Sequence, residues 1–137
     1  ANHNAYTIEP ELSPRQNLFA KIIRDSDKVD IFSIFLRNLQ GGHNVWNVDM
    51  SNLKFQSISD AVMHQARQSI SVRTRDKKTF MDYYAGMLCM YFDIQFDKTR
   101  QLVWENGDLA TLLAFHSRND DTEQKLAEIR TLICNFK

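Results

Sequence analysis

A strongly apolar segment runs from Phe80 to Phe92. Its large apolar side chains are Phe80, Met81, Tyr83, Tyr84, Met87, Leu88, Met90, Tyr91 and Phe92. At helical spacing these side chains occur on nearly every side, which is typical of a helix surrounded by other helices. Thr79 and Asp82 can form a capping box at its start. The segment therefore predicts a buried central helix with other helices packed around it.

Composition also favours helices over a turn-rich β-sandwich. The chain of 137 residues contains 43% hydrophobic and 25% charged residues, with only four Gly and two Pro. This length and composition are ordinary for one globular domain. We therefore predict a mainly α fold, a compact single-domain bundle of about five or six helices. It is expected over residues 13–137, after an N-terminal arm over residues 1–12.

Three segments do not follow the helical pattern. Apolar residues alternate in parts of 43–56 and 93–105, and alternation is typical of β-strands. A small β-hairpin therefore competes with helix over 93–105, which would make the fold α+β, and 43–56 is expected to be a loop with one short strand. Residues 70–74 are rich in β-branched side chains and are expected to be extended.

The start of the domain is predicted to be a helical hairpin. Ser13, Pro14 and Gln16 form a capping-box signature. One apolar face follows, made of Leu18, Phe19, Ile22 and Ile23. The polar cluster 25–27 is expected to end this helix, and a second helix is expected over 28–40. Because the helices of a hairpin pack their apolar faces together, this face should be buried.

Two shorter helices are predicted from their caps. Ser57 and Asp60 offer a cap for a short helix that continues to Ala66. Asp108 can cap another helix, which is expected to end near Arg118.

The last helix is predicted from about Asp121 to Phe136, with Asp121 and Lys125 as a favourable ion pair four residues apart. Its apolar seam has coiled-coil spacing and consists of Leu126, Ile129, Ile133 and Phe136. Such a seam either packs on the body of the domain or forms a dimer or partner interface. Both interpretations remain open from the sequence.

No sequence pattern predicts a catalytic, metal or cofactor site. The four His residues are scattered singly, and no His/Cys pair has zinc-ligand spacing. Gly41-Gly42 lacks the remaining residues of a phosphate-binding loop. Cys89 and Cys134 lie in apolar segments and are expected to be buried thiols. We therefore expect no cofactor, no metal and no catalytic residues.

Charge and hydropathy restrict the partners of the chain. Seventeen basic residues balance seventeen acidic ones, so no global field favours nucleic acid or an anionic membrane. The longest apolar run, Ala85 to Phe92, is far shorter than the roughly 20 residues that cross a bilayer. No membrane insertion is expected. The cytoplasm is the expected compartment, and secretion or the periplasm after removal of a signal peptide is the alternative.

One local strip departs from neutrality. It contains Arg67, Arg73, Arg75, Lys77 and Lys78, opposed only by Asp76. If these residues are contiguous in space, with Lys98 and Arg100 as candidate extensions, they could bind phosphates or an acidic protein surface. A charged run is more often simply a solvated face.

These observations favour a non-enzymatic interaction or regulatory protein that binds a macromolecular partner, either another protein or a second copy of itself. The alternative is a nucleic-acid-associated regulator that uses the basic strip. A third hypothesis is an enzyme whose site assembles only in three dimensions.

Overall fold

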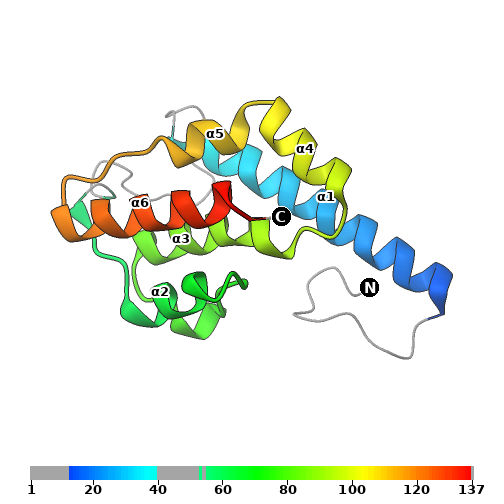
Figure 1. Ribbon diagram of the computed structural model, residues 1–137, viewed down its shortest axis with the longest axis horizontal. Coiled ribbons are helices and arrows are strands. Elements are labelled where there is room, and N and C mark those ends of the chain that lie inside the picture. The colour runs from blue at the N-terminus through cyan, green and yellow to red at the C-terminus, as the bar shows by residue number, and fades with distance from the viewer. Residues whose placement is uncertain (1–12, 40–52, 54, 137) are drawn as a thin grey trace.

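Six α-helices make up most of the computed structural model, which describes residues 13–39, 53 and 55–136 (Figure 1). In chain order the helices are α1 (Pro14–Leu39), α2 (Asp60–Arg67), α3 (Phe80–Cys89), α4 (Asp97–Glu105), α5 (Asp108–Leu113) and α6 (Asp120–Cys134). Two short 3-10 helices, η2 (Thr74–Asp76) and η3 (Met90–Asp93), flank α3. The prediction of a mainly α bundle is confirmed.

None of the predicted β-structure occurs in the described ranges. Helix α4 occupies most of 93–105, so the hairpin alternative there is wrong. Residues 70–73 belong to no helix or strand, and Thr74 begins η2. The strand expected within 43–56 falls almost wholly on residues 40–52 and 54, which lie outside the described residues.

Helix α3 is the centre of the fold, as its apolar sequence predicts. It contacts α1, α2, α5 and α6, and every residue from Met81 to Cys89 except Tyr83 is buried. Its capping box forms as predicted: the Thr79 hydroxyl accepts from the Asp82 N–H at 3.0 Å, and the Asp82 carboxylate accepts from the Thr79 N–H at 3.2 Å. The most apolar segment thus becomes the helix that four others cover.

Helix α1 is one continuous helix, so the predicted helical hairpin is wrong. It begins at the predicted capping box, in which the Ser13 hydroxyl accepts from the Gln16 N–H at 3.2 Å and Gln16 Oε1 accepts from the Ser13 N–H at 3.0 Å. It then passes through the polar cluster 25–27 without a break. No Gly or Pro stands between Pro14 and Gly41 to interrupt it.

Tertiary contacts explain why this polar cluster does not end α1. The Asp25 carboxylate accepts from the backbone N–H groups of Gln95 at 2.9 Å and Phe96 at 3.0 Å, where α4 begins. A short polar side chain usually disfavours a helix by bonding to its own backbone. The carboxylate of Asp25 instead accepts hydrogen bonds from another segment, so it does not compete with the backbone bonds of α1 and the helix continues.

Two cations of α1 contact the same distant segment. Arg24 Nη2 lies 2.8 Å from the Asp93 carboxylate, and Lys28 Nζ lies 3.4 Å from it. Both cations are buried. Buried charges are tolerated when they are paired and hydrogen-bonded. Arg24, Asp25 and Lys28 therefore attach the middle of α1 to residues 93–96.

The last helix packs within the domain. Helix α6 is capped by Asn119, which accepts from the Thr122 N–H at 3.2 Å, and the predicted ion pair between Asp121 and Lys125 forms at 3.0 Å. Its seam lies against the rest of the chain: Leu126, Ile129 and Ile133 are buried, and Phe136 is half-buried. The Phe136 ring contacts the rings of Tyr91 and Phe92.

The ends of α2 and α5 differ from prediction. The N-cap residue of α2 is Ser59 rather than Ser57, and its hydroxyl donates to Asp82 at 2.6 Å instead of capping α2. Helix α5 starts after Gly107, whose φ of 81° is in the left-handed region that favours glycine. It ends at Leu113, well before Arg118.

Within the described ranges, no helix combines the length and the apolar character needed to cross a membrane.

Replacing Asp25 tests the attachment of α1. We expect Asp25→Asn to lower the free energy of unfolding by about 1–3 kcal/mol. The amide oxygen of Asn can still accept a hydrogen bond from one of the two backbone N–H groups, but its NH₂ group is a donor and leaves the other N–H without an acceptor. Asp27→Asn removes the same charge from the same helix and should change it by less than about 0.5 kcal/mol. Urea unfolding of both variants measures the difference, and equal effects would contradict this role of Asp25.

Candidate functional site

The first half of α1 carries four exposed apolar side chains, which we call the α1 apolar face. It consists of Leu18, Phe19, Ile22 and Ile23, which are 48%, 52%, 44% and 44% exposed. The prediction that a second helix covers this face is wrong, because no hairpin forms. Four large hydrophobic side chains adjacent on one helix are unusual in a folded domain and typical of a contact surface.

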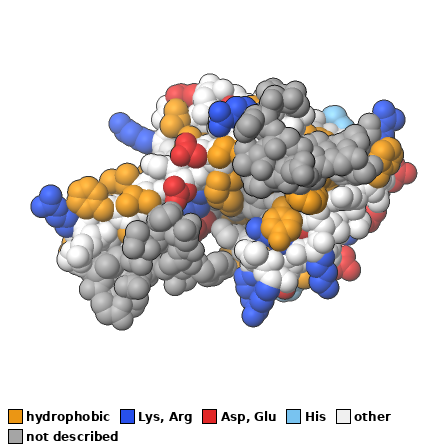
Figure 2. Space-filling model, turned by 180° about the vertical axis from the view of Figure 1, so that it is seen from behind, with side chains coloured by type: hydrophobic (Ala, Val, Ile, Leu, Met, Phe, Trp, Pro, Cys, Tyr) orange, Lys and Arg blue, Asp and Glu red, His pale blue; other side chains and the backbone are white. Residues whose placement is uncertain are grey.

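The geometry of α1 explains why the rest of the domain does not cover this face. Successive residues of an α-helix are about 100° apart. The buried residues Ala20, Arg24 and Lys28 form one stripe along the helix, and the α1 apolar face lies nearly opposite. The N-terminal turns of α1 also extend past the other helices (Figure 1). Seen from behind, hydrophobic side chains gather along this projecting end (Figure 2).

Charged residues of opposite sign stand at the two ends of the α1 apolar face. Arg15 is exposed on the first turn, and its guanidinium lies 5.7 Å from the centre of the Phe19 ring. Asp30 is exposed farther along α1. Helical spacing puts both residues in the same sector of the helix as Phe19 and Ile22. An exposed cation thus lies about one turn before the apolar residues, and an exposed anion lies about two turns after them.

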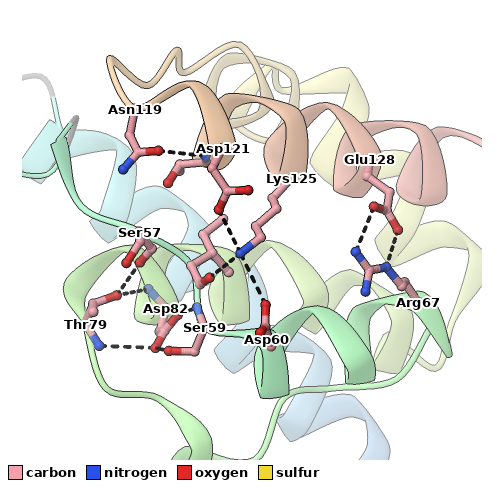
Figure 3. A network of polar contacts seen from close by, with 12 residues as sticks. Ser57, Ser59, Asp60, Arg67, Thr79, Asp82, Asn119, Asp121, Lys125 and Glu128 are labelled. Atoms are coloured by element: carbon pink, nitrogen blue, oxygen red, sulfur yellow. Dashed lines mark hydrogen bonds and ion pairs between the residues drawn. The ribbon is translucent and has the colours of Figure 1, made fainter.

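A polar network lies on another part of the molecule, where the starts of α2, α3 and α6 meet (Figure 3). Asp82 is its centre. Its carboxylate accepts from the Ser59 N–H at 2.7 Å, the Ser59 hydroxyl at 2.6 Å, the Lys78 N–H at 2.8 Å and the Thr79 N–H at 3.2 Å. The Thr79 hydroxyl also donates to the Ser57 carbonyl at 2.8 Å. Asp82 thereby ties residues 57–59 to the start of α3.

These bonds determine what Asp82 can do chemically. Burial by itself raises the pKa of Asp82, but the hydrogen bonds from Ser59, Lys78 and Thr79 outweigh burial and hold the pKa below its usual value. A carboxylate with a lowered pKa is a weak base. The hydroxyl of Ser59 donates to it without being activated as a nucleophile, because activation needs a base able to take the proton. This network is a structural clamp.

Two further contacts join α2 to α6 (Figure 3). Lys125 Nζ donates to the Ile58 carbonyl at 2.8 Å and lies 3.0 Å from the Asp121 carboxylate and 3.5 Å from that of Asp60. Desolvation by itself lowers the pKa of Lys125, but the carboxylates of Asp121 and Asp60 together outweigh it and raise the pKa above its usual value. Arg67 pairs with Glu128 through two nitrogens, at 2.6 and 3.2 Å.

Two cations of the predicted basic strip form ion pairs with other residues of the chain. Arg67 belongs to the pair with Glu128, and Arg73 Nε lies 3.2 Å from the Asp76 carboxylate. The candidate extension by Lys98 and Arg100 does not occur, because α4 and α2 lie on different sides of the molecule (Figure 1). Arg100 pairs instead with Asp97 at 2.7 Å.

Lys77 turns toward the body of the domain. Its Nζ lies 5.3 Å from the centre of the Tyr83 ring, and its stem occupies the space beside Gly86, where an added Cβ would lie 2.5 Å from Lys77 Cε. Burial lowers the pKa of Lys77. The two remaining basic residues, Arg75 and Lys78, are exposed. Arg67 and Arg73 are also about half-exposed despite their ion pairs, so of the five cations of the strip Lys77 is the one that turns inward.

The two cysteines lie in different surroundings. Both are free thiols. Cys89 is buried as predicted, and burial raises its pKa to about 12 although nearby Lys77 opposes this rise. Such a thiol is protonated and unreactive near neutral pH. The prediction of burial is wrong for Cys134, which is exposed near the end of α6.

In the part of the chain that the structure describes, no three His, Cys, Asp or Glu side chains are grouped so that they could hold a metal ion. His116 pairs with Glu123, with Nδ1 and Oε2 2.7 Å apart. This hydrogen bond from His116, with another from the Ser117 N–H, lowers the pKa of Glu123.

Sequence reasoning found the residues of the α1 apolar face but misplaced them in the core. The sequence contains a usable signal: no Gly or Pro separates the two predicted helices, so the polar cluster 25–27 by itself is weak evidence for a break. The Asp82 clamp was found only in part, as a capping box. Its contacts to Ser59 join residues 23 apart in sequence and leave no local pattern.

Searches against protein-family models, curated proteins and solved structures find no match to this chain.

Replacing Asp82 tests the clamp and its pH dependence. The pKa of Asp82 is lower in the folded state than in the unfolded chain, so the stability it contributes is present above about pH 5 and is lost as the pH falls below about 4. We expect Asp82→Asn to lower the free energy of unfolding by about 2–3 kcal/mol at pH 7. The variant should also lose less stability than wild type between pH 5 and pH 3.

Unfolding curves at several pH values provide the measurement, with Asp27→Asn as the control for loss of one negative charge. If Asp82→Asn and wild type lost stability in parallel as the pH fell, the acid sensitivity would belong to other carboxylates.

Proposed function

We propose that this chain is a non-enzymatic interaction protein that acts by binding a protein surface through the α1 apolar face. The observation that carries this proposal is the exposure of Leu18, Phe19, Ile22 and Ile23 on projecting turns of one helix. Amphipathic helices commonly bind partners through apolar side chains at spacings of three and four residues. The spacing of these four residues fits that mode.

The energetics of α1 support the proposal. Burying a large apolar side chain stabilises a protein by about 1.5–3 kcal/mol relative to leaving it exposed. The domain leaves four such side chains half-exposed together, while it buries Arg24 and Lys28 on the other side of the same helix. A partner that covers the apolar strip would recover the free energy of burial that intramolecular packing leaves unused.

The polar groups of the domain support a binding role over catalysis. The carboxylate of Asp82 accepts four hydrogen bonds within the fold. The thiol of Cys89 is buried and has a raised pKa. The lowered pKa of Asp82 makes its carboxylate a weak base, and the raised pKa of Cys89 keeps its thiol protonated, so neither group is prepared for catalysis.

A charged substitution within the α1 apolar face tests this function. We expect Ile22→Asp to abolish binding, since it places an unpaired carboxylate at the centre of the contact, while the fold is kept because the residue is exposed. Ile70→Asp is the matched control, because Ile70 is 41% exposed and lies after α2, away from α1. Circular dichroism and urea unfolding should be close to wild type for both variants.

Binding is measured by cross-linking with identification of the bound protein, followed by titration of that purified protein against the wild type and both variants. Loss of binding in Ile22→Asp with retention in Ile70→Asp supports the proposal. Binding that is equal in all three, or lost equally in both variants, would contradict it.

A further inference from the structure

We infer that the α1 apolar face pairs with the same face of a second copy of this chain, with the two α1 helices antiparallel about a two-fold axis. This inference rests on the proposed function and names the partner. It is drawn from the order of charged and apolar residues along α1.

The apolar residues are self-complementary in an antiparallel pair. A two-fold axis between Ala20 and Lys21 places Phe19 opposite Ile22 of the second copy. Leu18 and Ile23 lie on the two flanks of this pair, and each faces the same residue of the second copy. In an isologous contact the Phe19–Ile22 pair occurs twice. All four residues of the α1 apolar face therefore meet an apolar residue of the second copy.

The charges at the two ends of the face select this direction. In the antiparallel pair, Arg15 lies beside Ser26 of the second copy, and Asp30 of that copy follows one turn farther, about 6 Å along the axis. The long Arg15 side chain can reach that carboxylate. A parallel pair would instead place Arg15 beside Arg15 and Asp30 beside Asp30, which is repulsive. Charge complementarity thus favours antiparallel pairing of two copies.

The placement of α1 allows a second helix to approach. The α1 apolar face points away from the stripe formed by Ala20, Arg24 and Lys28, which faces the domain. The projecting N-terminal turns lie beyond the other helices (Figure 1), and their hydrophobic side chains are accessible on the surface seen in Figure 2.

The contact is small, which sets its expected strength. Four half-exposed side chains from each copy bury less than the roughly 1,000 Å² of a stable interface. We therefore expect a weak dimer, which forms at protein concentrations of about 0.1–1 mM.

A charge exchange tests the inference by sedimentation equilibrium of the purified chain from about 10 µM to about 1 mM. Arg15→Glu and Asp30→Arg should each weaken dimerisation by about five-fold or more, because each places like charges together across the axis. The double variant Arg15→Glu/Asp30→Arg should return to within about twofold of wild type, since it restores opposite charges. High salt should reduce the defect of each single variant.

Two apolar variants complete the design. Ile22→Asp should be monomeric at every concentration, and Ile70→Asp should dimerise as wild type does. A wild type that stays monomeric at 1 mM would overturn the inference. So would a dimer that Ile22→Asp leaves intact, or a double charge variant that remains as weak as the single ones.

The outcomes separate this inference from the proposed function. If wild type is monomeric but a different protein binds it and is lost in Ile22→Asp, the α1 apolar face has another occupant and only the dimer fails. If Ile22→Asp changes neither self-association nor binding of any other protein, both fail.

Discussion

The hydrogen bonds from the Gln95 and Phe96 backbone to the Asp25 carboxylate determine much of the rest of the structure. They attach the middle of α1 to the start of α4, and the ion pairs of Arg24 and Lys28 with Asp93 reinforce the attachment. Because this attachment turns the stripe of Ala20, Arg24 and Lys28 toward the domain, the opposite side of α1 faces outward. The exposure of the α1 apolar face is therefore a consequence of a polar contact made elsewhere on the same helix.

Asp82 has a comparable role at the other polar centre. Residues 57–59 and 78–79 are brought together because one buried carboxylate accepts hydrogen bonds from both. Both centres use a short acidic side chain to satisfy backbone N–H groups at the start of a helix, where such groups have no partner within the helix. The two carboxylates thus hold the helices in place, while the apolar core around α3 supplies most of the driving force.

The surfaces of the domain differ in how far other parts of the chain contact them. The apolar seam of α6 is covered by the chain itself, and the cations Arg67, Arg73 and Lys77 of the basic strip are already in contact with residues of the domain. The α1 apolar face has no comparable cover from the helices of the domain. The proposed binding role depends on this exposure of four adjacent apolar side chains, because covering them stabilises a contact, whereas an exposed ion pair contributes little.

The sequence by itself determined the helical class, the central position of α3, the capping boxes at Ser13 and Thr79, and the helical course of α6. These features follow from side chains a few residues apart, whose spacing and local hydrogen bonds are visible in one segment. Only the tertiary structure decided that α1 is continuous and that its apolar face is exposed. The reason is physical: Asp25 accepts its hydrogen bonds from residues 70 and 71 positions away, and such contacts leave no trace in the local pattern.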